Sequence, residues 1–192
     1  MPRASEPRLP PRDRILLAAE ELFYQEGIVR VTVDAIAEKA QSTKMTLYRH
    51  FESKEVLVRE WIGLLIEDYS HVLDKLAKCH ADNAAEQIKG FVRFVIDNLS
   101  GTSRRGCPFT NTLAETGDQY VDVRALIIGH KQRQYQRLEA LCSGAGAKAP
   151  ELLAKEITLL LEGIQVVSQN GSFDKASEFT LEIIEAKLAN LK

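Results

Sequence analysis

The sequence has few cysteines, and none lies at a spacing that binds metal. Cys79, Cys107 and Cys142 are far apart and odd in number, and neither a CxxC nor an HxxxH pair occurs. We therefore expect reduced thiols, no metal site and no cofactor. Cys107 follows two arginines and precedes an expected helix start, which favours a reactive thiolate. A buried, inert cysteine is the alternative.

Long apolar runs are also absent. No stretch approaches the roughly 20 apolar residues that cross a bilayer. The opening segment, MPRASEPRLPPRDR, lacks the apolar core of a secretory signal. We interpret residues 1–11 as a flexible arm rich in Pro and Arg, and we expect a cytoplasmic protein with no membrane partner.

Neither sign of charge dominates the chain. In 192 residues, 25 Lys and Arg face 27 Asp and Glu, for a formal net charge of −2. This balance argues against a protein that coats nucleic acid indiscriminately. Within residues 39–54, however, Lys39, Lys44, Arg49 and Lys54 face only Glu52. Any nucleic-acid footprint is therefore expected to be local.

Nearly every segment repeats its apolar residues with helical period, and no alternating strand pattern of useful length occurs. The sequence therefore predicts an all-α fold of about nine helices. Thr32 and Ser53 stand at expected helix N-caps, and Gly27 stands at the end of the first helix. Pro108 occupies the first position of a helix expected over residues 108–116.

Residues 32–51 predict two short helices joined by a three-residue turn. Ala37 and Ala40 permit a close crossing of the two, and Leu47 and Phe51 anchor the second helix. This arrangement is typical of a helix-turn-helix. The other side chains of the second helix, Tyr48 among them, then face outward, where hydroxyls and cations suit a phosphate backbone.

The stretch TVDAIAEKAQSTKMTLYRHF, followed by ESKEVL, resembles the DNA-binding signature of the TetR family, and the preceding RILLAAEELFYQEG is similar to the first helix of that domain. The resemblance implies a DNA-binding domain over residues 12–53 and a ligand-binding and dimerisation domain over residues 54–192. It also implies a dimeric repressor that binds a palindromic double-stranded DNA operator and is released by a small-molecule effector. The residues expected at the DNA are Thr32, Ser42, Thr43, Lys44, Met45, Thr46, Tyr48, Arg49, His50 and Lys54.

The turn departs from the family pattern. Where relatives usually have Gly then Val, this sequence has Gln41 then Ser42. The positive-φ position of the turn then falls to Gln41, at a cost of about 1 kcal/mol, and we expect the turn to survive. Met45 replaces a residue that is often small, and its apolar side chain suits contact with a thymine methyl group.

The two helices expected over residues 151–169 and 174–191 carry apolar residues on two sides. In the first of them, one stripe includes Leu153, and a second consists of Leu152, Leu159 and Val166. Because a helix apolar on two sides must be buried on two sides, we expect a four-helix interface between two copies of the chain. A fully internal hairpin is the alternative. The residues assigned to the interface are Leu153, Ile157, Leu160, Ile164, Phe179 and Ile183.

Large or polar residues on otherwise apolar helical faces are the candidates for an effector site. Gln132, for example, continues the stripe Val121, Ala125 and Ile128, where an aliphatic residue is expected. A polar group in such a row indicates a cavity, and for each candidate the alternative is an ordinary core or surface residue. The candidates are Trp61, Phe91, Phe94, Phe109, Asn111, Glu115, Gln132, Tyr135 and Gln165.

Two other classes of protein compete with a regulator. A small helical enzyme would need a nucleophile elbow or paired acid and base residues on one helical face, and the sequence shows neither. The histidines, at positions 50, 71, 80 and 130, are scattered. A scaffold that binds partner proteins leaves the basic short helix unexplained. We therefore expect a regulator and not an enzyme.

Overall fold

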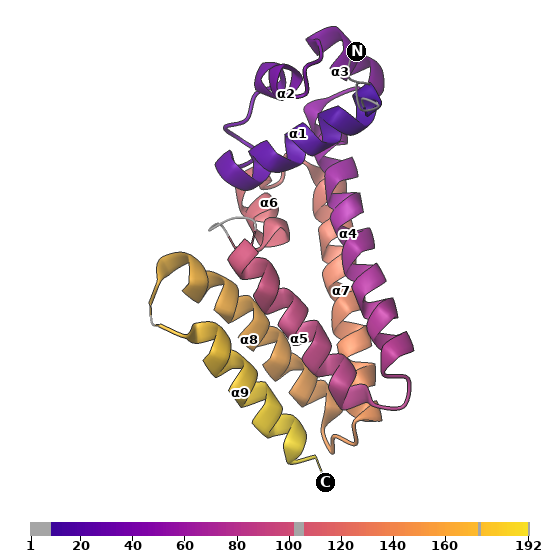
Figure 1. The fold of residues 1–192 in the computed structure, drawn as a ribbon, viewed down its shortest axis with the longest axis vertical. Coiled ribbons are helices and arrows are strands. Elements are labelled where there is room, and N and C mark those ends of the chain that lie inside the picture. The colour runs from indigo at the N-terminus through magenta and orange to yellow at the C-terminus, as the bar shows by residue number, and fades with distance from the viewer. Residues whose placement is uncertain (1–8, 102–105, 173, 192) are drawn as a thin grey trace, which may run out of the picture.

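The computed structural model describes residues 9–101, 106–172 and 174–191 as helices joined by short turns (Figure 1). No strand occurs in these ranges, so the prediction of an all-α fold is confirmed. Most of the predicted N-terminal arm, residues 1–8, lies outside the described residues. The helices are α1 (Pro11–Glu26), α2 (Val33–Lys39), α3 (Lys44–His50), α4 (Lys54–Cys79), α5 (Ala84–Gly101), α6 (Pro108–Thr116), α7 (Val121–Gly144), α8 (Pro150–Asn170) and α9 (Ala176–Ala189).

The helices begin and end at the residues that the sequence indicates. The Thr32 hydroxyl accepts a hydrogen bond from the Ala35 amide, and Ser53 accepts one from Val56, both at 3.1 Å. These bonds satisfy backbone donors that α2 and α4 leave free at their first turns. Pro108 is the first residue of α6, and Gly27 follows α1 with a φ of 86°. The four predicted helix-end positions are confirmed.

The turn between α2 and α3 is held by the hydrogen bonds of a Schellman motif. The Ser42 amide donates to the Ala37 carbonyl at 2.8 Å, and the Gln41 amide donates to the Glu38 carbonyl at 2.9 Å. This motif requires a left-handed residue just past the helix, and Gln41 has a φ of 48°, as predicted. The Arg14 guanidinium from α1 donates to the Ala40 carbonyl at 3.0 Å, which ties the turn to the first helix.

One apolar core joins α1, α2 and α3 to the long helices that follow. Phe51, Trp61, Phe109 and Ile127 belong to the same cluster, although they come from the α3–α4 connection, α4, α6 and α7. The first half of α4 is therefore shared between the predicted domains. The division between residues 12–53 and 54–192 stays a prediction.

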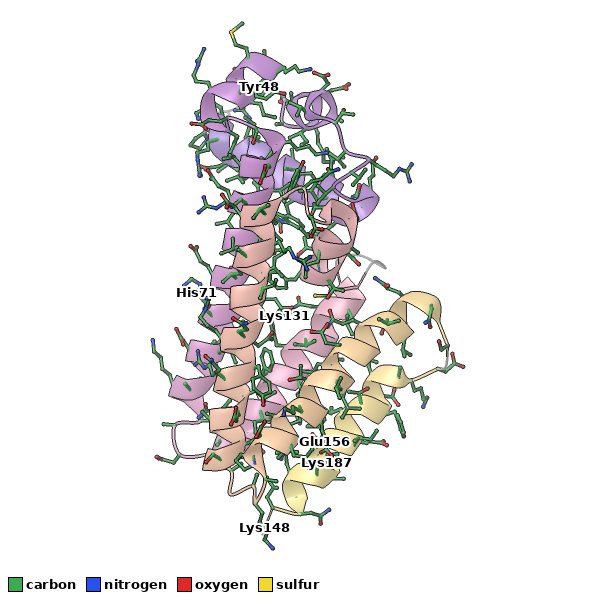
Figure 2. All side chains as sticks on the ribbon, turned by 180° about the vertical axis from the view of Figure 1, so that it is seen from behind. Tyr48, His71, Lys131, Lys148, Glu156 and Lys187 are labelled. Atoms are coloured by element: carbon green, nitrogen blue, oxygen red, sulfur yellow. The ribbon has the colours of Figure 1, made fainter. Side chains whose placement is uncertain are left out.

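A second core lies between α5, α7, α8 and α9, with α8 and α9 side by side along one flank (Figure 1). Glu156 and Lys187 form an ion pair at 2.8 Å between these two helices (Figure 2). Within the described part of the chain, no helix is long and apolar enough to cross a membrane. The same residues include no group of three or more side chains arranged to hold a metal ion.

The predicted partner interface on α8 is wrong for three residues. Leu153, Ile157 and Ile164 are buried inside the single chain, because this side of α8 faces the protomer's own helices. Leu160 and Ile183 are half-buried, and Phe179 is exposed. The second stripe of α8 is the exposed one, with 58% of Leu152, 72% of Leu159 and 54% of Val166 accessible.

Candidate nucleic-acid interface and effector cavity

Helix α3 presents one apolar face to the protein and a mixed face to solvent. Leu47 and Phe51 are fully buried, whereas 74% of Met45 and 44% of Tyr48 are exposed. Figure 2 shows Tyr48 near one end of the long molecule, at the end opposite Lys148. A protruding helix at one end of the fold is the geometry with which helix-turn-helix proteins enter a major groove.

The predicted hydroxyl contacts have structural roles as well. Thr43 caps α3 by accepting a hydrogen bond from the Thr46 amide at 3.1 Å, and the two hydroxyls lie 2.9 Å apart. Thr32 caps α2 in the same way. Ser42 is half-buried in the turn. The remaining predicted side chains of α3, namely Lys44, Arg49 and His50, are exposed on its outer face.

Lys54 differs from the other predicted phosphate contacts. Its ammonium donates to the Ile28 carbonyl in the loop between α1 and α2, and the side chain is half-buried. Burial lowers the pKa of this ammonium. The structure therefore gives Lys54 the role of holding the start of α4 against that loop, and its predicted position on a phosphate is not supported.

Two of the cations within residues 39–54 form ion pairs with carboxylates on neighbouring helices. Lys44 pairs with Asp34 of α2 at 3.0 Å, and Lys39 pairs with Glu21 of α1 at 2.6 Å. The hydrogen bond that the Lys44 ammonium donates to the Asp34 carboxylate, together with the negative charge of Asp34, raises the pKa of Lys44. Arg49 has no ion pair or hydrogen bond among the described residues.

The ion pair between Lys44 and Asp34 leads to a prediction for DNA affinity. The carboxylate competes with a phosphate for the same ammonium, so Asp34→Asn should raise operator affinity by about three- to tenfold, with the gain shrinking as salt is added. Electrophoretic mobility shifts at two salt concentrations measure this. Asp82→Asn, an exposed change in the α4–α5 connection, is the matched control. Weaker binding by Asp34→Asn would mean instead that Asp34 positions Lys44 for the duplex.

Two neighbouring cavities, here called the outer and the inner cavity, lie between the long helices. The outer one has a volume of about 210 Å³ and is bounded by α1, α4, α5, α8 and the start of α6. The inner one, of about 310 Å³, lies between α4, α5, α6, α7 and α8. Tyr69, Val95 and Gln165 line both cavities, so these three side chains lie between them. The inner cavity, which is mostly apolar with a few polar groups, has the size and lining of a small-molecule site. The outer cavity is smaller and more polar.

Four of the predicted effector residues line these cavities. Phe94 lines the outer cavity, Phe91 and Tyr135 line the inner one, and Gln165 lines both. Gln165 is itself buried, and its amide donates to the Leu161 carbonyl of its own helix at 2.9 Å. The structure therefore brings together residues that are far apart in the sequence.

The other candidates lie elsewhere. Trp61, Asn111 and Glu115 surround a separate hollow of only about 10 Å³, beside the loop between α1 and α2. Phe109 is fully buried in the core. The interpretation of Gln132 is wrong, because its side chain is exposed on the outside of α7 together with Val121 and Ile128. The buried side of α7 runs instead through Val123, Ile127, His130, Leu138 and Cys142.

Sequence reasoning missed two polar residues in this region, namely Tyr69, which lines both cavities, and His130, which packs against Tyr69 and Phe109. Tyr69 packs edge-on against Phe94 at 4.9 Å and Phe109 at 5.4 Å. Its position on the apolar stripe of α4 was a usable signal. His130 is buried, and burial together with nearby cations lowers its pKa to about 4, so the imidazole is neutral at pH 7. No residue spacing indicates this histidine.

An ion pair on the inner cavity lies close to a thiol on the outer cavity. Lys131 of α7 pairs with Glu162 of α8 at 2.6 Å, and its ammonium lies 3.9 Å from the Cys107 sulfur. Cys107 is buried and lines the outer cavity. This position agrees with the alternative of a buried cysteine.

Comparison with known proteins gives matches in the N-terminal part of the chain. Residues 15–61 match the family model described as bacterial regulatory proteins, tetR family. Over 70 residues the chain is 37% identical to the HTH-type transcriptional regulator TtgR of Pseudomonas putida, a match covering 36% of this chain and 33% of that protein. It is 33% identical over 92 residues to the HTH-type transcriptional activator FasR of Mycolicibacterium smegmatis, covering 48% of this chain and 35% of that protein. The chain thus matches about a third of the length of these relatives.

Solved structures match the whole fold. SCO4454, a TetR-family transcriptional regulator from Streptomyces coelicolor, superposes with a TM-score of 0.86 at 27% identity, over 94% of this chain and 95% of that one. A TetR transcriptional regulator from Legionella pneumophila superposes with a TM-score of 0.81 at 19% identity, over 97% of this chain and 99% of that one. The second likeness concerns the fold alone.

Proposed function

Because this chain belongs to the TetR family of bacterial transcriptional regulators, we propose that it represses transcription by binding a palindromic DNA operator as a homodimer. The observation that carries the proposal is the orientation of α3. Its outer face combines an exposed Met45 and Tyr48 with exposed cations, while Leu47 and Phe51 fix its inner face in the core. The proposed DNA contacts are the exposed α3 side chains together with Thr32 and Thr43 at the helix N-termini.

A second copy of the chain supplies the other half of the operator contact. The exposed stripe Leu152, Leu159 and Val166 on α8 and the exposed Phe179 on α9 support an interface through these two helices. A twofold axis there sets the distance between the two α3 helices. That distance must be about 34–36 Å for both helices to enter successive major grooves on one side of the duplex.

A small-molecule effector in the cavities would release the operator. The cavities lie beside α4, which extends from the DNA-binding unit into the larger helical bundle. The Glu115 carboxylate of α6 also accepts a hydrogen bond from the Val29 amide, in the loop between α1 and α2, at 3.1 Å. A ligand that favours a different placement of α4 or α6 therefore changes the spacing of the α3 helices, and DNA affinity falls by linkage.

Binding selection with genomic fragments tests the proposal. Purified protein should enrich a small set of duplexes that share an inverted repeat, and binding should weaken steeply with salt. Expression of a reporter gene fused to a selected fragment should rise when the regulator is deleted. A fall would show activation, as the name of the relative FasR indicates for that protein. Enrichment of random fragments without a shared repeat would contradict the proposal.

A further inference from the structure

The outer cavity carries two carboxylates from facing helices. Glu20 of α1 is half-buried, and Asp68 of α4 is exposed at the rim. Neither carboxylate has an ion-pair or hydrogen-bond partner among the described residues. Burial, and then the charge of Asp68, raise the pKa of Glu20. The two groups therefore make a negative site that no cation among the described residues neutralises, and a bound cation would relieve their repulsion.

Three aromatic rings line the same cavity. Tyr24 comes from α1, Tyr69 from α4 and Phe94 from α5. Tyr69 and Phe94 lie edge to face, with their ring centres 4.9 Å apart. Aromatic faces attract organic cations, and the attraction is stronger where water is excluded. The described residues include no group of three or more His, Cys, Asp or Glu side chains that could hold a metal ion, at this cavity or elsewhere. The combination fits an organic ammonium group.

The inner cavity shares Tyr69, Val95 and Gln165 with this site, and the rest of its lining is different. Phe91, Leu138 and Leu161 line it with apolar surface. Its cation, Lys131, is already paired with Glu162. A ligand that fills both cavities thus needs one charged end and one apolar body.

We propose that the effector is a small organic cation whose ammonium group lies between Glu20 and Asp68 and whose apolar part enters the inner cavity past Tyr69. This inference rests on the proposed function, in which the cavities hold the effector. Glu20 and Tyr24 belong to α1, and the other lining residues belong to α4, α5, α8 and the start of α6. A cation bound here contacts α1 of the DNA-binding unit directly, so its binding can change the position of that unit.

Three probes of nearly equal shape test the inference by isothermal titration calorimetry on the full chain. They are benzyltrimethylammonium, its uncharged carbon analogue neopentylbenzene, and the anion phenylmethanesulfonate. The cation should bind at least about tenfold more tightly than the uncharged analogue, and the anion should not bind. Glu20→Gln and Asp68→Asn should each weaken binding of the cation by about fivefold and leave the uncharged analogue unaffected.

Neighbouring acidic residues provide matched controls. Glu21→Gln and Glu67→Gln remove a charge one position away, outside the outer cavity, and should leave cation binding unchanged. Equal binding of cation and uncharged analogue, no binding of the cation, or wild-type cation affinity in the double variant Glu20→Gln/Asp68→Asn would each overturn the inference. The comparison of probes on the wild-type protein does not depend on how the variants fold.

Operator binding by the same preparation separates the two proposals. If the protein binds its operator but does not prefer the cation, the proposal of a cationic effector is wrong and the proposal of a DNA-binding regulator stands. If the protein prefers the cation but binds no DNA, the proposed regulator function is wrong and the proposed cation site stands.

Discussion

The variant Leu159→Asp should be a monomer at concentrations where the proposed wild-type dimer forms. Leu159 is 72% exposed in the single chain, so the charge costs the protomer little. In a twofold interface the same charge is buried twice, and each uncompensated buried charge costs about 3–5 kcal/mol. We expect the dimer dissociation constant to rise at least about 100-fold. Analytical ultracentrifugation measures this directly.

Operator affinity should fall together with dimerisation, because a monomer holds only one half-site. Leu64→Asp makes the same chemical change at an exposed leucine on α4 and serves as the control, which should remain a dimer that binds DNA. A Leu159→Asp protein that sediments as a dimer would show that α8 uses another surface, and the proposed interface would have to be abandoned.

Lys44→Ala and Tyr48→Ala should each reduce operator affinity by about 100-fold or more. Both side chains lie on the outer face of α3, and a dimer loses each contact in both half-sites. Lys44→Ala should also reduce the dependence of binding on salt, because fewer counterions are released. Fluorescence anisotropy with a labelled operator gives both quantities.

The matched control for Lys44→Ala is Lys78→Ala, which removes a positive charge at the far end of α4. It should leave affinity and salt dependence unchanged. Circular dichroism should report equal helical content in all variants, since neither α3 side chain is buried. If both α3 variants bind the operator as tightly as the wild-type protein, α3 is not the helix that contacts DNA.

The sequence was most informative where local chemistry decides the structure. Caps at Thr32 and Ser53, the proline that starts α6 and the left-handed Gln41 follow from backbone hydrogen bonding and sterics, which depend on near neighbours. Leu47 and Phe51 were recognisable as the anchors of α3 because only a few residues in that helix are apolar.

It was least informative where a helix is apolar on more than one side. On α8 the stripes containing Leu153 and Leu159 look equivalent in sequence, and only the packing of the bundle buries the first and exposes the second. Gln132 was misplaced for the same reason, since apolar residues also lie on the outside of α7. The cavity carboxylate Glu20 lies on α1, far in sequence from the helices that complete the site, so no local pattern reveals it.

Photocrosslinking from α3 tests the central claim most directly. A photoreactive side chain at position 45, where Met45 is 74% exposed, should crosslink to bases within the operator half-sites. The same group at position 140, on the outer side of α7, should give no crosslink to DNA. Crosslinks from position 140 but none from position 45, in a protein that still binds its operator, would contradict the claim that α3 faces the duplex.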